Sequence, residues 1–280
     1  MHQTEVRPGV WMAYEDDWFG QPWTVPEAVV MLHGNCESSR AWTCWVPHFC
    51  GKFRIVRPDL PGFGASPEPT HYGWGVGELA ADVVRLLDAL GVMKCHLIGA
   101  KYGGSVAMQL AGNYPDRLSS LALFGSPVRG SGSGNADTIR QKGVRQWAVE
   151  TMAGRLGSVA SPAQVAWWTD ELMAKTGTRA AFSASAARID MELEQHLSRI
   201  TAPTLIVTTQ ESGLQSVEAV KRYAQKIADV RVIVLPGDAY HVAAVEPDLC
   251  ARHALDFIAS LSPAAADRTN EAMSAPRAAE

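Results

Sequence analysis

The segment 97–104, with the sequence LIGAKYGG, most constrains the fold because it predicts a strand that passes into a helix through a tight turn. The apolar strand ends at Ile98 and the helix begins at Gly103. Glycines on both sides of the turn leave room for a close approach of strand and helix. A strand followed directly by a helix is the repeating unit of a parallel α/β sheet. Lys101 occupies the apex of this turn.

The same alternation of strands and helices continues along most of the chain. Apolar runs and turn signals predict strands at 10–18, 28–32, 53–56, 95–98, 118–124, 204–208 and 230–235, and helical spacing predicts helices at 79–90, 103–114, 216–227 and 248–261. The run 28–32 is apolar throughout, which is typical of a strand buried on both faces. The alternation therefore predicts an α/β fold, with a mostly parallel, doubly wound sheet and helices on both faces.

One segment interrupts this alternation between residues 129 and 200. It opens with the glycine- and serine-rich run RGSGSG at 129–134, and from about residue 138 it shows helical spacing without a convincing strand. A helical insertion between strands is expected to cover the carboxyl edge of the sheet, where ligands bind. We therefore expect a core made of 1–128 and 201–261, a helical lid at 129–200, and a tail at 262–280, rich in alanine, proline and charge, that is disordered.

Bulk properties narrow the class of function. The net charge of −4 gives no basic surface for nucleic acid or for an anionic membrane. The residues 1–8 are polar, and no apolar run approaches the roughly 20 residues that span a bilayer. Five cysteines show neither C-x-x-C nor zinc-ligand spacing, which indicates free thiols in a reducing compartment. We expect a cytoplasmic protein that binds a small molecule, without nucleic-acid or membrane partners, and leave its oligomeric state open.

Several short motifs appear in a fixed order along the chain. These are HGN at 33–35, DLPGFGAS at 59–66, the turn at 99–103, and GDAYH at 237–241. In this order they resemble the α/β-hydrolase superfamily over about residues 10–261. The short helical lid is most similar to that of 3-oxoadipate enol-lactonase-like members. The resemblance implies an α/β-hydrolase fold with the lid inserted before the last strands.

The resemblance also implies roles for particular residues. His241 stands at the position of the catalytic histidine, and the backbone N–H groups of Asn35 and Tyr102 stand where the superfamily forms its oxyanion hole. Lys101 stands where the superfamily carries its nucleophilic serine. A lysine cannot perform the acyl transfer of serine, so the chain is not a conventional serine esterase.

The acidic partner of the histidine departs from the family pattern as well. Ser212 falls at the usual aspartate position, Glu211 is its neighbour, and Asp238 lies on the histidine loop. We take Glu211 as the candidate acid and leave open which residue orients His241. Trp147, Trp167 and Arg129 are candidates for substrate binding, because each falls in the predicted lid or at its edge. No metal cluster and no phosphate-binding loop appear in the sequence, and we expect chemistry without a cofactor.

Three roles are open to Lys101. As a neutral amine it could form an imine with a carbonyl compound, although lowering its pKa from about 10.4 to 7 requires roughly 4–5 kcal/mol. As a cation it could hold a carboxylate or an enolate while His241 moves the proton. In the third case the protein is a catalytically degenerate binder of a small ligand.

The first two roles share one prediction. They indicate an enzyme of non-serine type, a hydrolase or lyase, that acts on a small enolisable carbonyl compound. Lactone or ester opening, C–C cleavage, decarboxylation and isomerisation all fit, with Lys101, His241 and Glu211 in the catalytic site.

Overall fold

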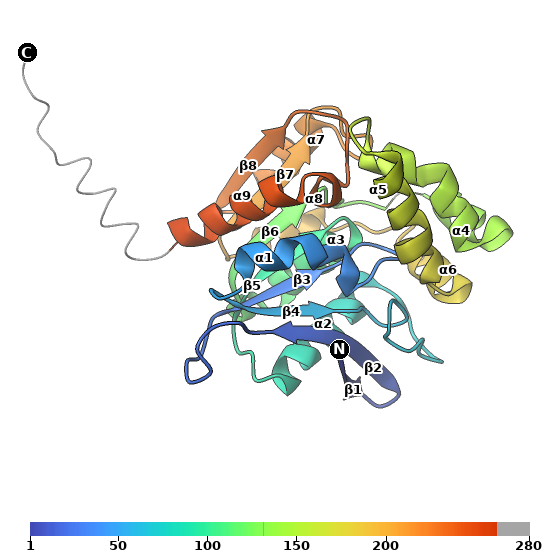
Figure 1. The fold of residues 1–280 in the computed structure, drawn as a ribbon. Coiled ribbons are helices and arrows are strands. Elements are labelled where there is room, and N and C mark those ends of the chain that lie inside the picture. The colour runs from blue at the N-terminus through green and yellow to red at the C-terminus, as the bar shows by residue number, and fades with distance from the viewer. Residues whose placement is uncertain (131, 262–280) are drawn as a thin grey trace, which may run out of the picture.

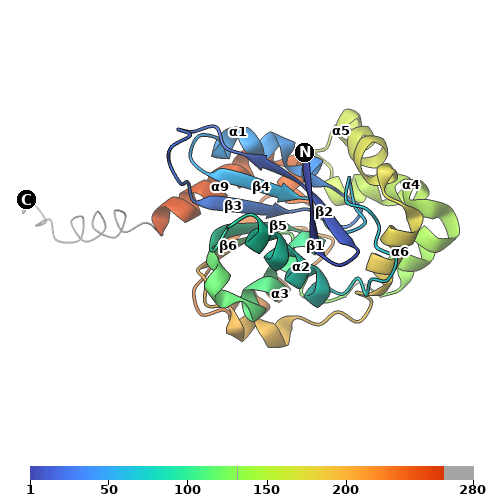
Figure 2. The same cartoon turned by 90° about the horizontal axis from the view of Figure 1, so that it is seen from below.

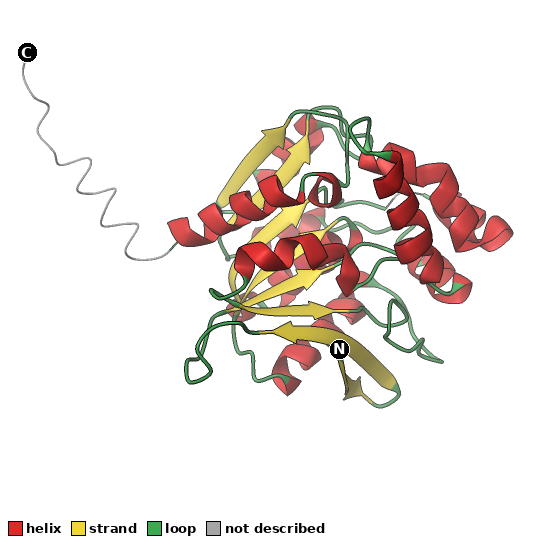
Figure 3. Ribbon diagram, viewed as in Figure 1, coloured by secondary structure: helices red, strands yellow, loops and turns green. Residues whose placement is uncertain are grey.

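The computed structural model describes residues 1–130 and 132–261, and within them the strands form one eight-stranded sheet. Its order is β1-β2-β4-β3-β5-β6-β7-β8, and Figure 3 shows the strands side by side with helices around them. The strands are β1 (His2–Arg7), β2 (Val10–Asp17), β3 (Ala28–Leu32), β4 (Arg54–Pro58), β5 (Cys95–Ala100), β6 (Leu118–Phe124), β7 (Thr204–Thr209) and β8 (Val230–Leu235). β2 pairs antiparallel with β1 and with β4, and the pairs from β4 to β8 are parallel. The predicted mostly parallel sheet is confirmed.

Helices cover both faces of this sheet, as predicted. Side chains of a strand alternate between the faces, so Val29 and Met31 of β3 pack with one set of helices and Val30 and Leu32 with the other. α1 (Val46–Phe49) and α9 (Pro247–Ser260) lie on the first face, and α2 (Val76–Ala89), α3 (Tyr102–Asn113) and α7 (Val217–Ala224) lie on the second (Figure 2). The short α8 (Val242–Val245) precedes α9.

The turn between β5 and α3 is tight because glycines remove the Cβ atoms that would block it. A Cβ on Gly103 would lie against the carbonyl oxygens of Leu32 and His33 at the end of β3, and a Cβ on Gly99 would lie 2.6 Å from the Cα of Gly104. These contacts are with backbone atoms, which cannot move aside cheaply. The glycines therefore bring α3 close to the sheet, and this approach places residue 101 above the carboxyl edge of the strands.

The helices α4 (Gly134–Leu156), α5 (Pro162–Ala166) and α6 (Thr178–Ala186) lie between β6 and β7 in the chain. Figure 1 shows them grouped on the side toward which the central strands point. Within 129–200, as far as the structure describes it, the β pairing is an isolated bridge between Arg129 and Glu192. The division into a core and a lid remains a prediction, and the predicted tail at 262–280 lies outside the described residues.

The strand β1 was not predicted, because its sequence HQTEVR is polar and shows no apolar run. It is an edge strand, and its partner β2 supplies the buried side chains of the pair. Arg7 at its end is paired with the fully buried Asp82 on α2, at 2.9 Å.

Among the described residues, no helix combines the length and the hydropathy needed to cross a membrane.

Candidate active site

The site is organised by the strained backbone of Lys101 between β5 and α3. Its φ of 52° and ψ of −120° lie in a region that L-residues rarely occupy, at a cost of order 1–3 kcal/mol. The backbone N–H of Lys101 donates to Phe124 at 3.0 Å, and its carbonyl accepts from Gly104 and Ser105. These bonds to β6 and to α3 hold the strained turn. The side chain is 9% exposed and lines a cavity.

A buried carboxylate that sequence reasoning missed faces the amine of Lys101. Oε1 of Glu37 lies 3.2 Å from Nζ of Lys101, and its side chain is fully buried. Oε2 of the same carboxylate accepts the backbone N–H of Gly34 at 2.9 Å. Glu37 follows β3, the neighbour of β5 in the sheet, so both residues lie at the carboxyl ends of adjacent parallel strands. The position of Glu37 just after a predicted parallel strand could have indicated a site residue from the sequence, because the carboxyl ends of such strands meet at one edge of the sheet.

His241 lies on the other side of the same carboxylate oxygen. Its Nε2 is 3.1 Å from Oε1 of Glu37, a close electrostatic contact without the alignment of a hydrogen bond. The ring packs edge-on against Trp168, with centroids 4.7 Å apart. Nδ1 is buried without a hydrogen-bond partner among the described residues. The geometry therefore gives His241 a carboxylate at Nε2 and leaves Nδ1 without an orienting acid.

Burial and charge set the protonation of this group. Burial lowers the pKa of Lys101 to about 8, although the carboxylate of Glu37 opposes the shift. Burial and the Lys101 ammonium together lower the pKa of His241 to about 4. Burial by itself would raise the pKa of Glu37, but His241 and Lys101 outweigh it and hold that pKa well below its usual range. At neutral pH the group thus contains an ammonium, a carboxylate and a neutral imidazole.

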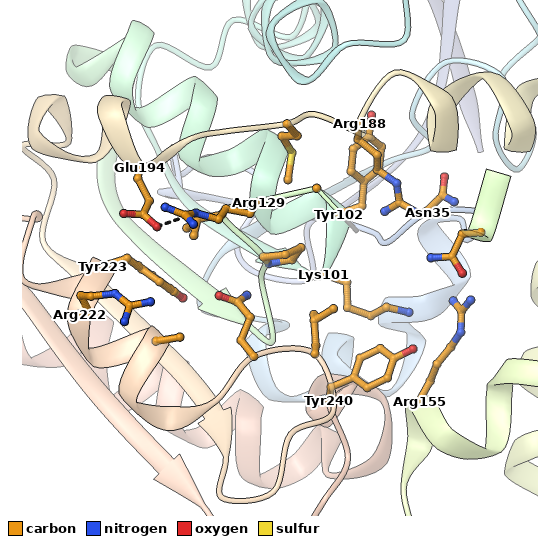
Figure 4. Close-up of a pocket in the computed structure, with 18 of the residues that line it drawn as sticks. Asn35, Lys101, Tyr102, Arg129, Arg155, Arg188, Glu194, Arg222, Tyr223 and Tyr240 are labelled. Atoms are coloured by element: carbon orange, nitrogen blue, oxygen red, sulfur yellow. Dashed lines mark ion pairs between the residues drawn. The ribbon is translucent and has the colours of Figure 1, made fainter. Parts of the chain in front are cut away.

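The amine of Lys101 opens onto a cavity of about 330 Å³ (Figure 4). Among the predicted site residues, Asn35, Lys101, Tyr102, Arg129 and Trp147 line this cavity. Its other lining side chains include Arg155, Arg188, Glu194, Gln215, Arg222, Tyr223 and Tyr240. The ring of Tyr240 lies 5.7 Å from Nζ of Lys101, close enough for a cation–π contact. The volume suits a small-molecule ligand.

Other predicted residues lie apart from this cavity. Glu211 is exposed, and its backbone N–H donates to Gly237 at 3.0 Å; within the described part of the chain no ion pair joins it to His241. Trp167 packs against Trp168 and under the guanidinium of Arg40. The structure therefore does not bring Glu211 or Trp167 to Lys101. Arg129 reaches the cavity, but it is 62% exposed and paired with Glu192 and Glu194.

His33 and Cys36 lie next to the site and have structural rather than chemical roles. Nε2 of His33 accepts the N–H of Leu60 at 2.9 Å, so its Nδ1 donates to the carbonyl of Gly34 at 2.7 Å and fixes the loop. The thiol of Cys36 is fully buried, and burial raises its pKa to about 12. Such a thiol is unreactive at neutral pH. Among residues 1–130 and 132–261, no group of three or more His, Cys, Asp or Glu side chains has the geometry to hold a metal ion.

Comparison with known proteins shows the family of this chain. The model of the alpha/beta hydrolase fold family matches residues 27–248. The chain belongs to the alpha/beta hydrolase fold family. Among its relatives, "Putative carbamate hydrolase RutD" of Variovorax paradoxus is 28% identical over 254 residues, which cover 84% of this chain and 93% of the relative. The 2-hydroxy-6-oxo-6-phenylhexa-2,4-dienoate hydrolase of Burkholderia cepacia is 24% identical over 84% of this chain and 88% of its own.

Solved structures agree with the fold. The enol-lactonase from Burkholderia xenovorans LB400 superposes with a TM-score of 0.81 and 21% identity, over 90% of this chain and 97% of that one. The esterase of Thermogutta terrifontis gives a TM-score of 0.79 and 22% identity, over 90% and 94% of the two chains. At this level of identity the likeness shows the α/β-hydrolase fold.

Within the α/β-hydrolase fold, the turn after β5 also presents backbone donors. Tyr102 is the first residue of α3, so its N–H has no acceptor within the helix. The side chain of Asn35 donates from Nδ2 to Oγ of Ser185 at 3.1 Å, and its Oδ1 is buried without a hydrogen-bond partner among the described residues. Both residues line the cavity beside Lys101. The oxyanion hole that the sequence predicts from the backbone N–H groups of these two residues stays a prediction.

Proposed function

We propose that this α/β-hydrolase-fold chain is an enzyme of non-serine type that acts on a small enolisable carbonyl compound. In this proposal Lys101 stands at the family's nucleophile position and acts as a cation on the carbonyl oxygen. The observation that carries the proposal is the ion pair of Lys101 with the buried Glu37, at the wall of the cavity. This pairing favours the charged role over imine formation, because a carboxylate at 3.2 Å stabilises the ammonium.

The charge state supports a role in both electrostatics and proton transfer. With a pKa of about 8, roughly nine-tenths of the Lys101 side chains are protonated at pH 7. An ammonium held in a buried site stabilises an enolate oxygen as its charge develops. A pKa this close to neutrality also suits a general acid. The backbone N–H groups of Tyr102 and Asn35, which form the predicted oxyanion hole, complete the set of donors around that oxygen.

In the proposed site, His241 acts through its contact with Glu37. It does not line the cavity, and both Nε2 of His241 and Nζ of Lys101 contact Oε1 of Glu37. We assign His241 a positioning role on Glu37, whose carboxylate holds the Lys101 ammonium at the cavity, in place of direct contact with the substrate. Glu37 therefore takes the place that sequence reasoning gave to Glu211.

The relatives support the reaction class. The name of the Burkholderia cepacia hydrolase describes a substrate with a ketone, a dienol and a carboxylate, and the Variovorax protein carries the name of a carbamate hydrolase. Both reactions develop negative charge on an oxygen. The proposal covers hydrolysis or C–C cleavage driven by the stabilisation of such an oxyanion, and it treats 129–200 as a lid, because Arg129, Trp147 and Arg155 from that segment line the cavity.

One observation favours a second function, a binding protein without turnover. Nδ1 of His241 has no acid partner in the described residues, and the ring lies behind Glu37, away from the cavity. In that case Lys101 would bind an anionic ligand and His241 would have no chemical role.

A substrate panel separates the alternatives. The protein is assayed with enol lactones, β-keto acids, vinylogous diketones and carbamates, in parallel with the variants Lys101→Met and His241→Gln. The proposal expects turnover of at least one carbonyl compound, a loss of a hundredfold or more in kcat for Lys101→Met, and a smaller loss for His241→Gln. No turnover by the wild type, with ligand affinity unchanged in His241→Gln, would establish the binding protein instead.

Borohydride trapping tests the charged role of Lys101. If the amine formed an imine with a keto substrate, reduction would leave a stable adduct on residue 101, and mass spectrometry would locate it. We expect turnover without such an adduct. An adduct on Lys101 that forms at the rate of turnover would replace the cationic role with the nucleophilic one.

A further inference from the structure

Two arginines next to Lys101, one buried and one partly buried, lie in the cavity wall without an acidic partner. Arg155, on α4, is 5% exposed, and Arg188, after α6, is partly buried. Within the described ranges, no ion pair joins either guanidinium to a carboxylate. Figure 4 shows both side chains directed, with Asn35 and Lys101, toward the same end of the cavity.

The contacts of both guanidinium groups are with aromatic faces and weak acceptors. Arg155 lies 4.1 Å over the ring of Trp147, and its Nε donates to Oγ1 of Thr151 at 3.1 Å. Arg188 lies 5.0 Å from the ring of Tyr102, and its buried Nε has no hydrogen-bond partner among the residues described. A guanidinium that stacks by its face keeps its N–H groups in the plane, where they can bind a planar anion.

The charges at this end of the cavity do not balance. Lys101, Arg155 and Arg188 bring three positive charges close enough that both arginines lower the pKa of the lysine, and Glu37 supplies one negative charge. Buried charges require a partner, because desolvation is expensive. At the opposite end, Arg129 is already paired with Glu192 and Glu194, and Arg222 is exposed to solvent. The missing negative charge therefore belongs between the two unpaired arginines.

We propose that Arg155 and Arg188 bind a carboxylate of the substrate, and that this cavity is selective for small oxo acids over their neutral esters. The inference rests on the proposed function, because it assigns the substrate class of the same cavity. The carboxylate would lie between the two guanidinium groups, and the carbonyl oxygen would face Lys101. Arg155 comes from α4 and Arg188 from the segment after α6, so a carboxylate would also tie two parts of the 129–200 segment to each other.

Binding measurements on the full chain test the inference without the need for turnover. Isothermal titration calorimetry at pH 7 compares levulinate, acetoacetate and 2-oxoglutarate with their methyl esters and with inorganic phosphate. We expect at least one oxo acid to bind with a stoichiometry of one, and its ester to bind at least tenfold more weakly. Each of the variants Arg155→Gln and Arg188→Gln should weaken the acid about tenfold or more, because a hydrogen bond to a charged group is lost.

The matched control is Arg145→Gln. Arg145 is on α4 like Arg155, but it is 64% exposed and paired with Asp170. Its replacement should leave the affinity for the oxo acid unchanged. Because an arginine variant could fail to fold, Arg155→Lys and Arg188→Lys are measured as well, and the comparison of acid with ester uses the wild type alone.

Each outcome decides the inference. Equal affinity for acid and ester, or no binding by any of the three acids, overturns it, and so does binding of phosphate alone. Unchanged affinity in both folded glutamine variants also overturns it. The proposed function fails separately: oxo acid binding that depends on both arginines, without turnover of any substrate, leaves the carboxylate site in place and removes the enzyme. Equal turnover of an oxo acid and its ester would instead keep the proposed enzyme and remove the carboxylate site.

Discussion

Replacement of Glu37 by glutamine should change the protonation of Lys101 without unfolding the protein. The carboxylate is the group that opposes the effect of burial on the lysine pKa, which falls from 10.5 to about 8 even with Glu37 present. Without the carboxylate this pKa falls further, so the amine loses its proton at pH 7. The glutamine side chain can still accept the N–H of Gly34 through its oxygen and can donate its NH₂ to the neutral amine.

The expected free-energy change follows from the pKa values. A folded-state pKa below the unfolded value means that the unfolded chain holds the proton more tightly, so stability rises with pH between about 8 and 10.5 in the wild type. The variant begins this rise at a lower pH. Above pH 8 the lysine of both folded proteins is neutral and its contribution to the difference vanishes. At pH 7 the contribution reaches at most about 1.4 kcal/mol, because each pKa unit corresponds to about 1.4 kcal/mol.

Urea unfolding of the wild type and of Glu37→Gln at several values between pH 6 and 9 measures this difference. We expect the variant to be less stable, and the gap between the two free energies of unfolding to grow as the pH falls below 8. The control is Glu150→Gln, which removes the carboxylate of the exposed pair with Lys142 and should give a difference independent of pH. A gap for Glu37→Gln that stays constant from pH 6 to 9 would refute the reasoning, as would an NMR titration midpoint of Lys101 at or above that of the wild type.

Three further predictions concern the surroundings of the site. Because the pKa of His241 falls from 6.5 to about 4 in the folded state, its contribution makes stability rise with pH between 4 and 6.5; His241→Gln should flatten the urea-unfolding free energy in this interval, and an unchanged slope would contradict the assignment. Gly103→Ala places a Cβ against backbone carbonyls and should cost more than about 4 kcal/mol, whereas Gly77→Ala in the open first turn of α2 should stabilise by up to about 1 kcal/mol; thermal melts of the two variants should therefore shift in opposite directions. Iodoacetamide at pH 7.5 should modify the exposed Cys44 and spare the buried Cys36 in the folded protein, and mass spectrometry that finds Cys36 modified first would show that the loop opens.

The site illustrates why a charge partner is difficult to find from sequence. The family pattern directed attention to the loop after β7, where Glu211 stands beside the expected acid position. In the structure Glu211 is exposed, and the loop after β3 supplies Glu37 to both Lys101 and His241. The sequence could predict that the loops after β3 and β5 lie at the same edge of the sheet, since strand ends of a parallel sheet meet at one edge. The direction of each side chain at that edge was not, because it depends on turns such as the one at Cys36, whose φ of 62° is unusual for a side-chain-bearing residue.

The arginines show the same limit in the inserted segment. Arg129 drew attention because it stands at the start of the segment, yet two glutamates neutralise it, while Arg155 and Arg188 reach the end of the cavity near Lys101. Helical spacing predicted that this segment is helical, but its hydrophobic pattern is weak and α4 contains a non-helical glycine, Gly143, at φ 81°. Such a break changes which residues face the cavity.

The architecture could be inferred from the sequence, because hydrophobic periodicity and glycine placement are local properties that act within a few residues. Strands such as Ala28–Leu32 and the turn at 99–103 follow from their own side chains. The lysine at the apex of this turn is identified from the sequence as well. The partner of that lysine, a buried carboxylate 64 positions away in the chain, became apparent only in the folded protein, as did the two arginines of a separate segment that line the same cavity. Electrostatics depends on distance through space and on burial, and neither quantity exists until the chain has folded.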